Sequence, residues 1–174
     1  TSPIGTRSNT TPRGSYLDAL SPLTVTLGVQ NVSFVAQAVD WIPESLFQIL
    51  TAAYRHRGFS FVRILQRCPE FVGNMFEPWV HDPQRMLMLT HADGIRVSPA
   101  LQKIYRNQLP HDPADINRAR EIASSDDPIP VGILYRNPEV PCYEDLRGAG
   151  KLRTADQVRG ALDGELDKFT VWPQ

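Results

Sequence analysis

The sequence predicts an α/β protein, with a parallel sheet and crossover helices followed by an irregular extension. Short apolar runs rich in β-branched and aromatic residues recur along the chain, and an amphipathic helical pattern separates the first two of them. The composition agrees, because 174 residues with 41% hydrophobic and 21% charged side chains are ordinary for a globular chain that has a core.

The first fifteen residues contain almost nothing that could enter a core. Ser, Thr, Gly, Pro and Arg dominate this segment, which predicts a loop or an arm. Residues 23–29 form a short apolar run, and periodicity alone does not decide between helix and strand there.

A strand, a helix and a second strand follow. Residues 32–36 predict a short strand, and residues 59–65 predict a second, buried strand. Pro43 suits the first position of the intervening helix, and Gly58 ends it. The apolar residues of this helix fall on one face at spacings of three and four: Leu46, Phe47, Leu50, Ala53 and Tyr54. Short joints between these elements predict a right-handed crossover in a parallel sheet.

The remainder of the chain has fewer clean periods. Residues 69–110 are rich in Trp, Met, Phe and Pro and are predicted to be irregular. We then expect a helix over 113–124 and a buried strand over 130–136, and Thr154 with Gln157 predicts a capping box that begins a last helix. The residues of the first of these helices that should point inward are Ile116, Ala119, Ile122 and Ala123.

Charge and hydropathy argue against two classes of partner. The 18 Lys and Arg residues balance 19 Asp and Glu, whereas a chain that binds nucleic acid through phosphates has a basic excess. No apolar run approaches the roughly 18 residues needed to span a bilayer, and the first residues given do not resemble a signal peptide. Two cysteines cannot form a disulfide framework, so we expect a cytoplasmic protein. The chain begins at Thr1 rather than Met, which predicts a processed chain or a fragment.

Cys68 is the first candidate for chemistry. It lies just past the carboxyl end of a predicted strand, where open α/β sheets place their ligands. A lone cysteine is more often a small buried hydrophobe. Only Cys142 remains beside it, so any iron–sulfur cluster here needs cysteines from elsewhere.

A histidine and aspartate metal site is a weaker hypothesis. Asp followed by Pro is a common helix start, and no two histidines have the i, i+4 spacing of a helical metal site. The residues that such a site would use are His81, Asp82, His91 and Asp93.

Four segments, in order along the chain, carry a family resemblance. They are Thr1-Ser2-Pro3 with Gly5 and Thr6; VSFVA at 32–36; RGFSFV through QRCP at 57–69 with Asn74; and PVGILYRN at 130–137 with Pro141 and Glu144-Asp145. The ordered set resembles the carboxyl-terminal half of the β subunit of 2-oxoacid:ferredoxin oxidoreductases, most closely the 2-oxoglutarate type.

This resemblance implies a thiamine diphosphate-binding-like fold and a large redox enzyme. The family decarboxylates a 2-oxoacid on thiamine diphosphate with Mg²⁺, passes electrons through 4Fe–4S clusters to ferredoxin and releases an acyl-CoA, or runs the reverse reductive carboxylation. On this resemblance Cys68 corresponds to the fourth ligand of the 4Fe–4S cluster near thiamine diphosphate, and Ser2 lies in the vicinity of thiamine diphosphate. Cys142 matches no ligand and is interpreted as structural.

The resemblance also implies which parts are missing. The Mg²⁺ and diphosphate segment, the other cluster cysteines and the substrate stretch would lie upstream of Thr1, so we expect the catalytic residues there, on the same polypeptide or on a separate chain. Ile4 stands where the family usually has Thr, which argues against a hydroxyl contact. An α subunit, ferredoxin, coenzyme A and a 2-oxoacid are the further partners expected.

Within this subunit we expect three parts. Residues 1–20 form a loop or arm near the cofactor, residues 21–70 form the carboxyl-terminal part of the thiamine-binding α/β domain, and residues 71–174 form an extension. The alternative function is a cofactor-free structural or interaction module of the same fold. Its partner surface would be the aromatic and Met-rich stretch at 71–89, although core packing is the more ordinary role of such residues.

Overall fold

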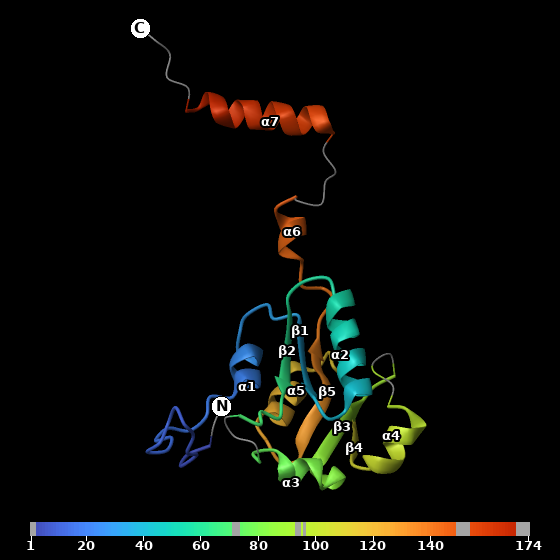
Figure 1. Cartoon of the computed structure of the whole chain (residues 1–174). Coiled ribbons are helices and arrows are strands. Elements are labelled where there is room, and N and C mark those ends of the chain that lie inside the picture. Colours follow the sequence, from blue (N-terminus) through green and yellow to red (C-terminus); the bar gives the residue numbers. More distant parts are fainter. Residues whose placement is uncertain (1–2, 71–73, 93–94, 96, 149–153, 170–174) are drawn as a thin grey trace. The chain divides into compact units, whose positions relative to one another are not determined.

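The computed structural model describes residues 3–70, 74–92, 95, 97–148 and 154–169. The chain divides into two compact units, Thr1–Val140 and Pro141–Gln174. The first unit holds a five-stranded sheet with helices on its two faces (Figure 1). In chain order its elements are α1 (Pro22–Leu27), β1 (Phe34–Val39), α2 (Pro43–Arg55), β2 (Ser60–Leu65), α3 (Glu77–Val80), the 3₁₀ helix η1 (Pro83–Arg85), β3 (Met86–Thr90), α4 (Pro99–Ile104), β4 (Gln108–Pro110), α5 (Ile116–Ala123) and β5 (Ile129–Arg136). The second unit holds α6 (Tyr143–Leu146) and α7 (Ala155–Asp167).

The strand order is β2-β1-β5-β3-β4. Parallel pairing joins β1 to β2, and β3 to both β4 and β5, which confirms the predicted α/β class and the β1–α2–β2 crossover. The junction between β1 and β5 is antiparallel. As a result, the carboxyl ends of β1 and β2 lie at the same end of the sheet as the amino ends of β3 and β5. Strands from both sides of residue 70 share this one sheet.

Local chemistry explains where the first helices begin and end. The ambiguous apolar run forms α1, because Ser21 caps the N–H of Thr24 and Pro22 occupies the first turn. Pro43 begins α2 as predicted, but the helix ends at Arg55 with an extended His56 as its C-cap, before the predicted stop at Gly58. Gly58 lies in the bend that follows, at φ +129°. The arm over residues 3–20 contains no helix or strand, in agreement with the sequence.

Two apolar clusters cover the two faces of the sheet. One lies under α2 and includes Phe34, Ile49 and Ile133, and the other lies under α1 and α5 and includes Leu23 and Leu134. The predicted inward residues of α5 belong to the second cluster. The predicted strand over 130–136 is β5, which is the central strand and is buried along almost its whole length.

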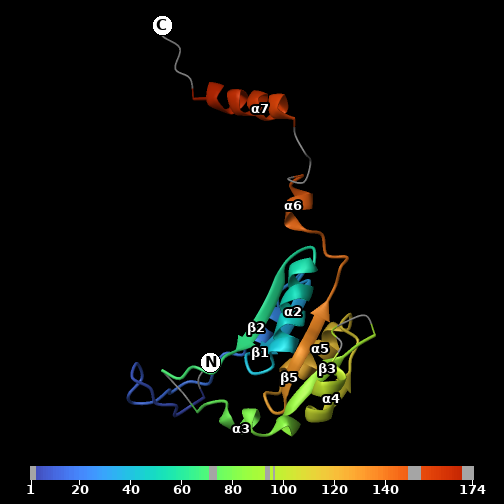
Figure 2. The same cartoon turned by 45° about the vertical axis from the view of Figure 1, so that its right-hand side comes forward.

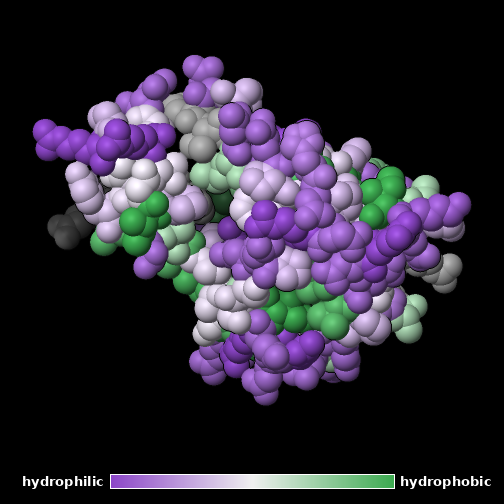
Figure 3. Space-filling model, turned by 90° about the horizontal axis from the view of Figure 1, so that it is seen from below, coloured by the Kyte–Doolittle hydropathy of each residue, from purple (hydrophilic) through white to green (hydrophobic). Residues whose placement is uncertain are grey.

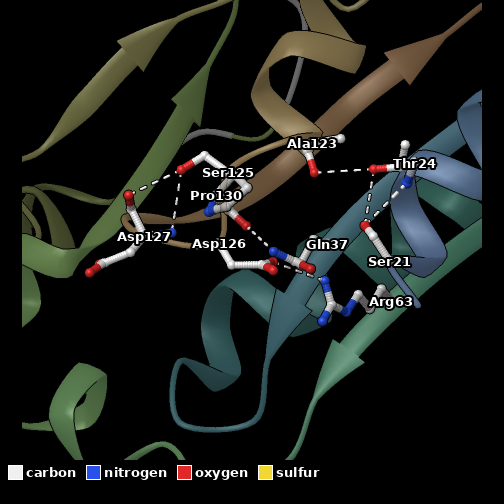
Figure 4. Close-up of polar contacts among 9 residues, drawn as sticks. All are labelled: Ser21, Thr24, Gln37, Arg63, Ala123, Ser125, Asp126, Asp127 and Pro130. Atoms are coloured by element: carbon white, nitrogen blue, oxygen red, sulfur yellow. Dashed lines mark hydrogen bonds and ion pairs between the residues drawn. The ribbon is translucent and has the colours of Figure 1, made fainter. Parts of the chain in front are cut away.

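Polar side chains bind neighbouring elements together on the α1 and α5 side of the sheet (Figure 4). The Gln37 side chain is buried on β1, and its Nε2 donates a 2.8 Å hydrogen bond to the carbonyl of Pro130. The Arg63 side chain on β2 lies 3.5 Å from the Asp126 carboxylate. These contacts join β1 to β5 and β2 to the loop that precedes β5.

The prediction of an irregular segment over 69–110 is wrong for half of its length, which forms α3, η1, β3, α4 and β4. Met86, Met88 and Leu89 are buried in β3, which pairs with β4 and β5. Methionine has no strong strand preference, so pairing with distant strands decided this structure rather than the local sequence. The same burial identifies the Met-rich stretch as core and removes the partner-surface interpretation of these three residues.

Two further expectations are corrected. Helix α5 begins at Ile116 rather than at 113, because Asp115 caps the N–H groups of Asn117 and Arg118 while Asp112 closes a separate turn on Ala114. Strand β2 was expected to be buried, but it lies at the edge of the sheet. Leu65 is its one buried residue.

The apolar face predicted for α2 packs on this sheet only in part, because Leu46 and Ala53 contact the core cluster and the other three predicted residues are exposed. The buried residues of the helix are Ser45 and Ile49. Phe47 and Tyr54 are exposed at 72% and 91%, and Leu50 is exposed at 43%. Spacing predicted an apolar face, but the position of the sheet determined which residues are buried.

Helix α7 has the predicted capping box, in which Thr154 and Gln157 exchange side-chain to backbone hydrogen bonds. Within its described residues none is buried, including Val158, Leu162 and Leu166. None of the helices in the described part of the chain is long and apolar enough to cross a membrane.

Candidate functional site

Cys68 lies three residues beyond the end of β2, at the end of the sheet where β1 also finishes. Its thiol is free and its side chain is half-buried. The structure therefore places the main sequence candidate where it was expected, at the carboxyl end of a parallel strand.

Asp40 connects the loop before Cys68 to β1. The backbone N–H of Asp40 donates a 3.0 Å hydrogen bond to the carbonyl of Leu65, which extends the β1–β2 ladder by one step. Its carboxylate accepts two hydrogen bonds from Arg67, one from the backbone N–H at 3.3 Å and one from Nε at 3.1 Å. These bonds fix the backbone immediately before Cys68.

An aromatic cluster lies at the same end of the first unit. The ring of Trp41, directly after Asp40, lies 5.6 Å from that of Phe76, and Phe76 lies 6.1 Å from Trp79. The Arg85 guanidinium stacks over Trp79 at 4.6 Å. Seen from this end, hydrophobic surface forms separate patches within a largely hydrophilic face (Figure 3).

Asp127 links this cluster to β5. Its carboxylate accepts hydrogen bonds from Arg85 Nε at 3.1 Å and from Trp79 Nε1 at 3.3 Å. The hydrogen bond from Arg85 lowers the pKa of Asp127 below its usual value, and the same bond raises the pKa of Arg85. The aromatic cluster is thereby anchored to the loop that leads into the central strand.

The described residues contain no group of three or more His, Cys, Asp or Glu side chains that could hold a metal ion. In the predicted His and Asp site, His81 ends α3, and Asp82 accepts a 3.0 Å hydrogen bond from the N–H of Gln84 as the cap of η1. Asp93 lies outside the described residues. The helix-capping alternative for Asp82 is thus confirmed.

The other sequence candidates do not join Cys68. Ser2 lies outside the described residues. Cys142 belongs to the second unit, where it precedes the first residue of α6 and its thiol donates a hydrogen bond to the Glu144 carboxylate. Within the described residues of the first unit, Cys68 is the one thiol, so four-thiolate coordination cannot be completed there.

A basic pocket of about 670 Å³ opens at the opposite end of the sheet. Arg55, His56 and Arg57 line it from the end of α2, and Arg136 lines it from the end of β5. Burial lowers the pKa of His56, and the charge of Arg136 lowers it further. The two ends of the sheet thus differ chemically. One end has a thiol and aromatic rings, and the other has clustered cationic side chains.

Sequence reasoning did not single out Asp40, Trp41, Arg85 or Asp127. Asp40 had a signal that could have identified it, because it is a polar residue directly after a buried strand. The ion pair between Arg85 and Asp127 spans 42 residues and had no such local signal.

Three comparisons place the chain among known proteins. Residues 100–150 match the family model for the C terminal of the pyruvate ferredoxin oxidoreductase beta subunit. The 2-oxoglutarate oxidoreductase subunit KorB of Mycobacterium tuberculosis is 33% identical over 97 residues, which are 55% of this chain and 26% of that protein. The 2-oxoacid:ferredoxin oxidoreductase subunit beta of a Sulfolobus species is 27% identical over 146 residues, or 81% of this chain and 43% of that protein.

A solved structure shares the fold. It is a 2-oxoglutarate:ferredoxin oxidoreductase from Magnetococcus marinus with 2-oxoglutarate, coenzyme A and succinyl-CoA bound. The TM-score is 0.62 at 23% identity, over 93% of this chain and 50% of that chain. The resemblance to β subunits of 2-oxoacid:ferredoxin oxidoreductases is therefore confirmed, and the chain spans half or less of the length of these proteins.

Proposed function

We propose that this chain forms the carboxyl-terminal part of the thiamine-binding β subunit of a 2-oxoacid:ferredoxin oxidoreductase. The enzyme would convert a 2-oxoacid and coenzyme A to an acyl-CoA and CO₂ with ferredoxin as electron acceptor, or run the reverse reaction. The observation that carries the proposal is the position of Cys68, on a loop that Asp40 attaches to the end of β1, in a chain similar to such subunits.

The residues present fit one ligand of a 4Fe–4S cluster. Cys68 offers a free, half-buried thiol on a fixed backbone. A 4Fe–4S cluster is held by four cysteine thiolates, so the other three are to come from outside this chain. No described residue is assigned to thiamine diphosphate or Mg²⁺, and Ser2 stays a proposed neighbour of thiamine diphosphate.

In this assembly the cluster supplies one-electron transfer when it is bound. The chain's own residues present and position the ligand. Asp40 holds the backbone of Arg67 and so sets the direction in which the next residue, Cys68, projects. The α subunit and the remainder of the β subunit would provide the substrate and coenzyme A contacts.

We take 2-oxoglutarate as the substrate, since two of the matched proteins are named for it. The purified enzyme should reduce ferredoxin in the presence of coenzyme A and 2-oxoglutarate. A higher kcat/KM with pyruvate than with 2-oxoglutarate would contradict this substrate assignment.

The test of the cluster role is Cys68→Ala in the assembled enzyme, with Cys142→Ala as the matched control. Cys68→Ala should lose the iron of one cluster, part of the broad visible absorption and the ferredoxin-linked activity, while Cys142→Ala keeps all three. Unchanged iron content in Cys68→Ala would refute the cluster role. An assembled protein that contains no iron at all would instead support the cofactor-free interaction module.

A further inference from the structure

Strand β2 has an open edge. It is the terminal strand of the sheet, and β1 is the one strand paired with it among the described residues. The Leu65 carbonyl accepts a hydrogen bond from the N–H of Asp40, so the backbone polar groups of Leu65 point toward β1. Successive residues of a strand alternate in this direction, and the backbone groups of Val62 and Ile64 therefore point away from β1. No hydrogen bond from another described backbone group reaches them.

This edge lacks the features that usually protect a terminal strand. Its six residues include no proline and one charge, Arg63, and its register with β1 has no bulge. Strand β4, at the other edge, has three residues and ends at Pro110. Natural sheets shorten, charge or cover edges that stay exposed, so β4 has the features of a permanent edge and β2 those of an edge that is paired.

Helix α2 presents apolar side chains toward the same edge. Its buried row, Ser45 and Ile49, faces the sheet, and two neighbouring rows flank it. The row with Gln48 and Ala52 lines the basic pocket together with Ile133 of β5, so this flank faces β5.

The opposite row of α2 consists of Leu46, Leu50 and Tyr54. In the sheet, β2 and β5 lie on the two sides of β1, and α2 covers this part of the sheet (Figure 2). Since the Gln48 and Ala52 row faces β5, we place the opposite row on the β2 side. Leu46 is partly buried, whereas Leu50 and Tyr54 are exposed at 43% and 91%, and Ile64 of β2 is exposed at 44%. We call this region the β2 edge surface. It consists of the exposed side chains of Leu50, Tyr54 and Ile64 and the outward backbone groups of Val62 and Ile64.

We propose that the β2 edge surface binds the part of the β subunit that the relatives have outside the matched region, on the same or a separate polypeptide. That part would add a strand parallel to β2, and a helix connected to this strand would pack on Leu50 and Tyr54. Two observations select this occupant. First, the matched solved chain is about twice as long as the region that it shares with this one. Second, β1 and β2 are parallel, and in parallel sheets crossover helices cover both faces.

The identity of the occupant rests on the proposed function, but its mode of binding has an independent readout. Amide hydrogen exchange should be measured at single residues in the assembled enzyme, purified through a tag on this chain. Val62 and Ile64 should be protected to within about tenfold of Phe61 and Arg63, whose amides face β1. Exchange at Val62 and Ile64 that is at least about a hundredfold faster than at Phe61 and Arg63 would show an open edge and overturn the proposal.

A substitution tests the side-chain part of the surface. Ile64→Lys should lower the assembled fraction, measured by native mass spectrometry, at least about tenfold, because it places a charge where an apolar contact forms. Ile104→Lys on α4 is the matched control, since Ile104 has a similar exposure of 51%, and it should assemble normally. Equal assembly of the two variants overturns the proposal, as does an assembly whose mass is a multiple of this chain alone.

These readouts are separate from the iron content of the Cys68→Ala enzyme. If the β2 edge is protected and the Cys68→Ala enzyme keeps its full iron content, the cluster role is contradicted and the edge proposal is kept. If the β2 edge is open and the Cys68→Ala enzyme loses iron, the edge proposal is overturned and the cluster role is kept.

Discussion

Gly132→Ala should destabilise the first unit strongly. Gly132 lies within the central strand β5 at φ +140°, a backbone conformation that residues with a side chain rarely adopt. A Cβ at this position would lie 2.8 Å from Leu89 Cβ and 3.1 Å from the Leu89 carbonyl oxygen. The substitution therefore adds backbone strain and a steric clash at one point of the sheet.

The two contributions set the magnitude. Strain at an unfavourable φ costs about 1–3 kcal/mol, and overpacking in a core costs a similar amount, so the free energy of unfolding should fall by about 2–5 kcal/mol. For a chain of this size each kcal/mol lowers Tm by about 2–4 °C, which gives a decrease on the order of 10 °C.

Thermal and urea unfolding followed by circular dichroism would measure this change. The matched control is Gly160→Ala on α7, where no atom lies within 4 Å of the added Cβ, and it should leave the unfolding of the first unit unchanged. Adding Leu89→Ala should not rescue Gly132→Ala, because alanine keeps both contacting atoms of Leu89. A Gly132→Ala protein that unfolds like the unmodified chain would refute this reasoning.

Two pH dependences follow from the charged groups. The pKa of Asp127 is lowered by its hydrogen bond from Arg85, so the carboxylate stabilises the fold near neutral pH. This contribution is lost as the pH falls below about 4. Asp127→Asn should therefore flatten the acid side of the curve of unfolding free energy against pH, and an unchanged curve would contradict the role of this bond. The pKa of His56 is lowered by burial and by Arg136, so unfolding is favoured as the pH falls below its ordinary value of 6.5. His56→Gln should reduce that slope, and the same slope in both proteins would show that other groups produce it.

Elements whose causes are local follow from the sequence alone. Pro43 begins α2, Thr154 and Gln157 cap α7, and the run at 130–136 forms β5. Each signal acts within a few residues, through a missing N–H, a side-chain cap or a short continuous apolar run. For the same reason the position of Cys68 at the end of a strand could be predicted from the residues around it.

Tertiary packing determines which surfaces these elements bury and which partners they meet. The helical spacing of α2 identified an apolar face, but the packing of Ile49 on the sheet left Leu50 and Tyr54 exposed beside β2. The hydrogen bonds from Arg67 to Asp40 and from Arg85 to Asp127 join residues 27 and 42 positions apart. Contacts of this kind depend on strand order and on the antiparallel junction between β1 and β5, and long-range pairing leaves no periodic signal in the chain.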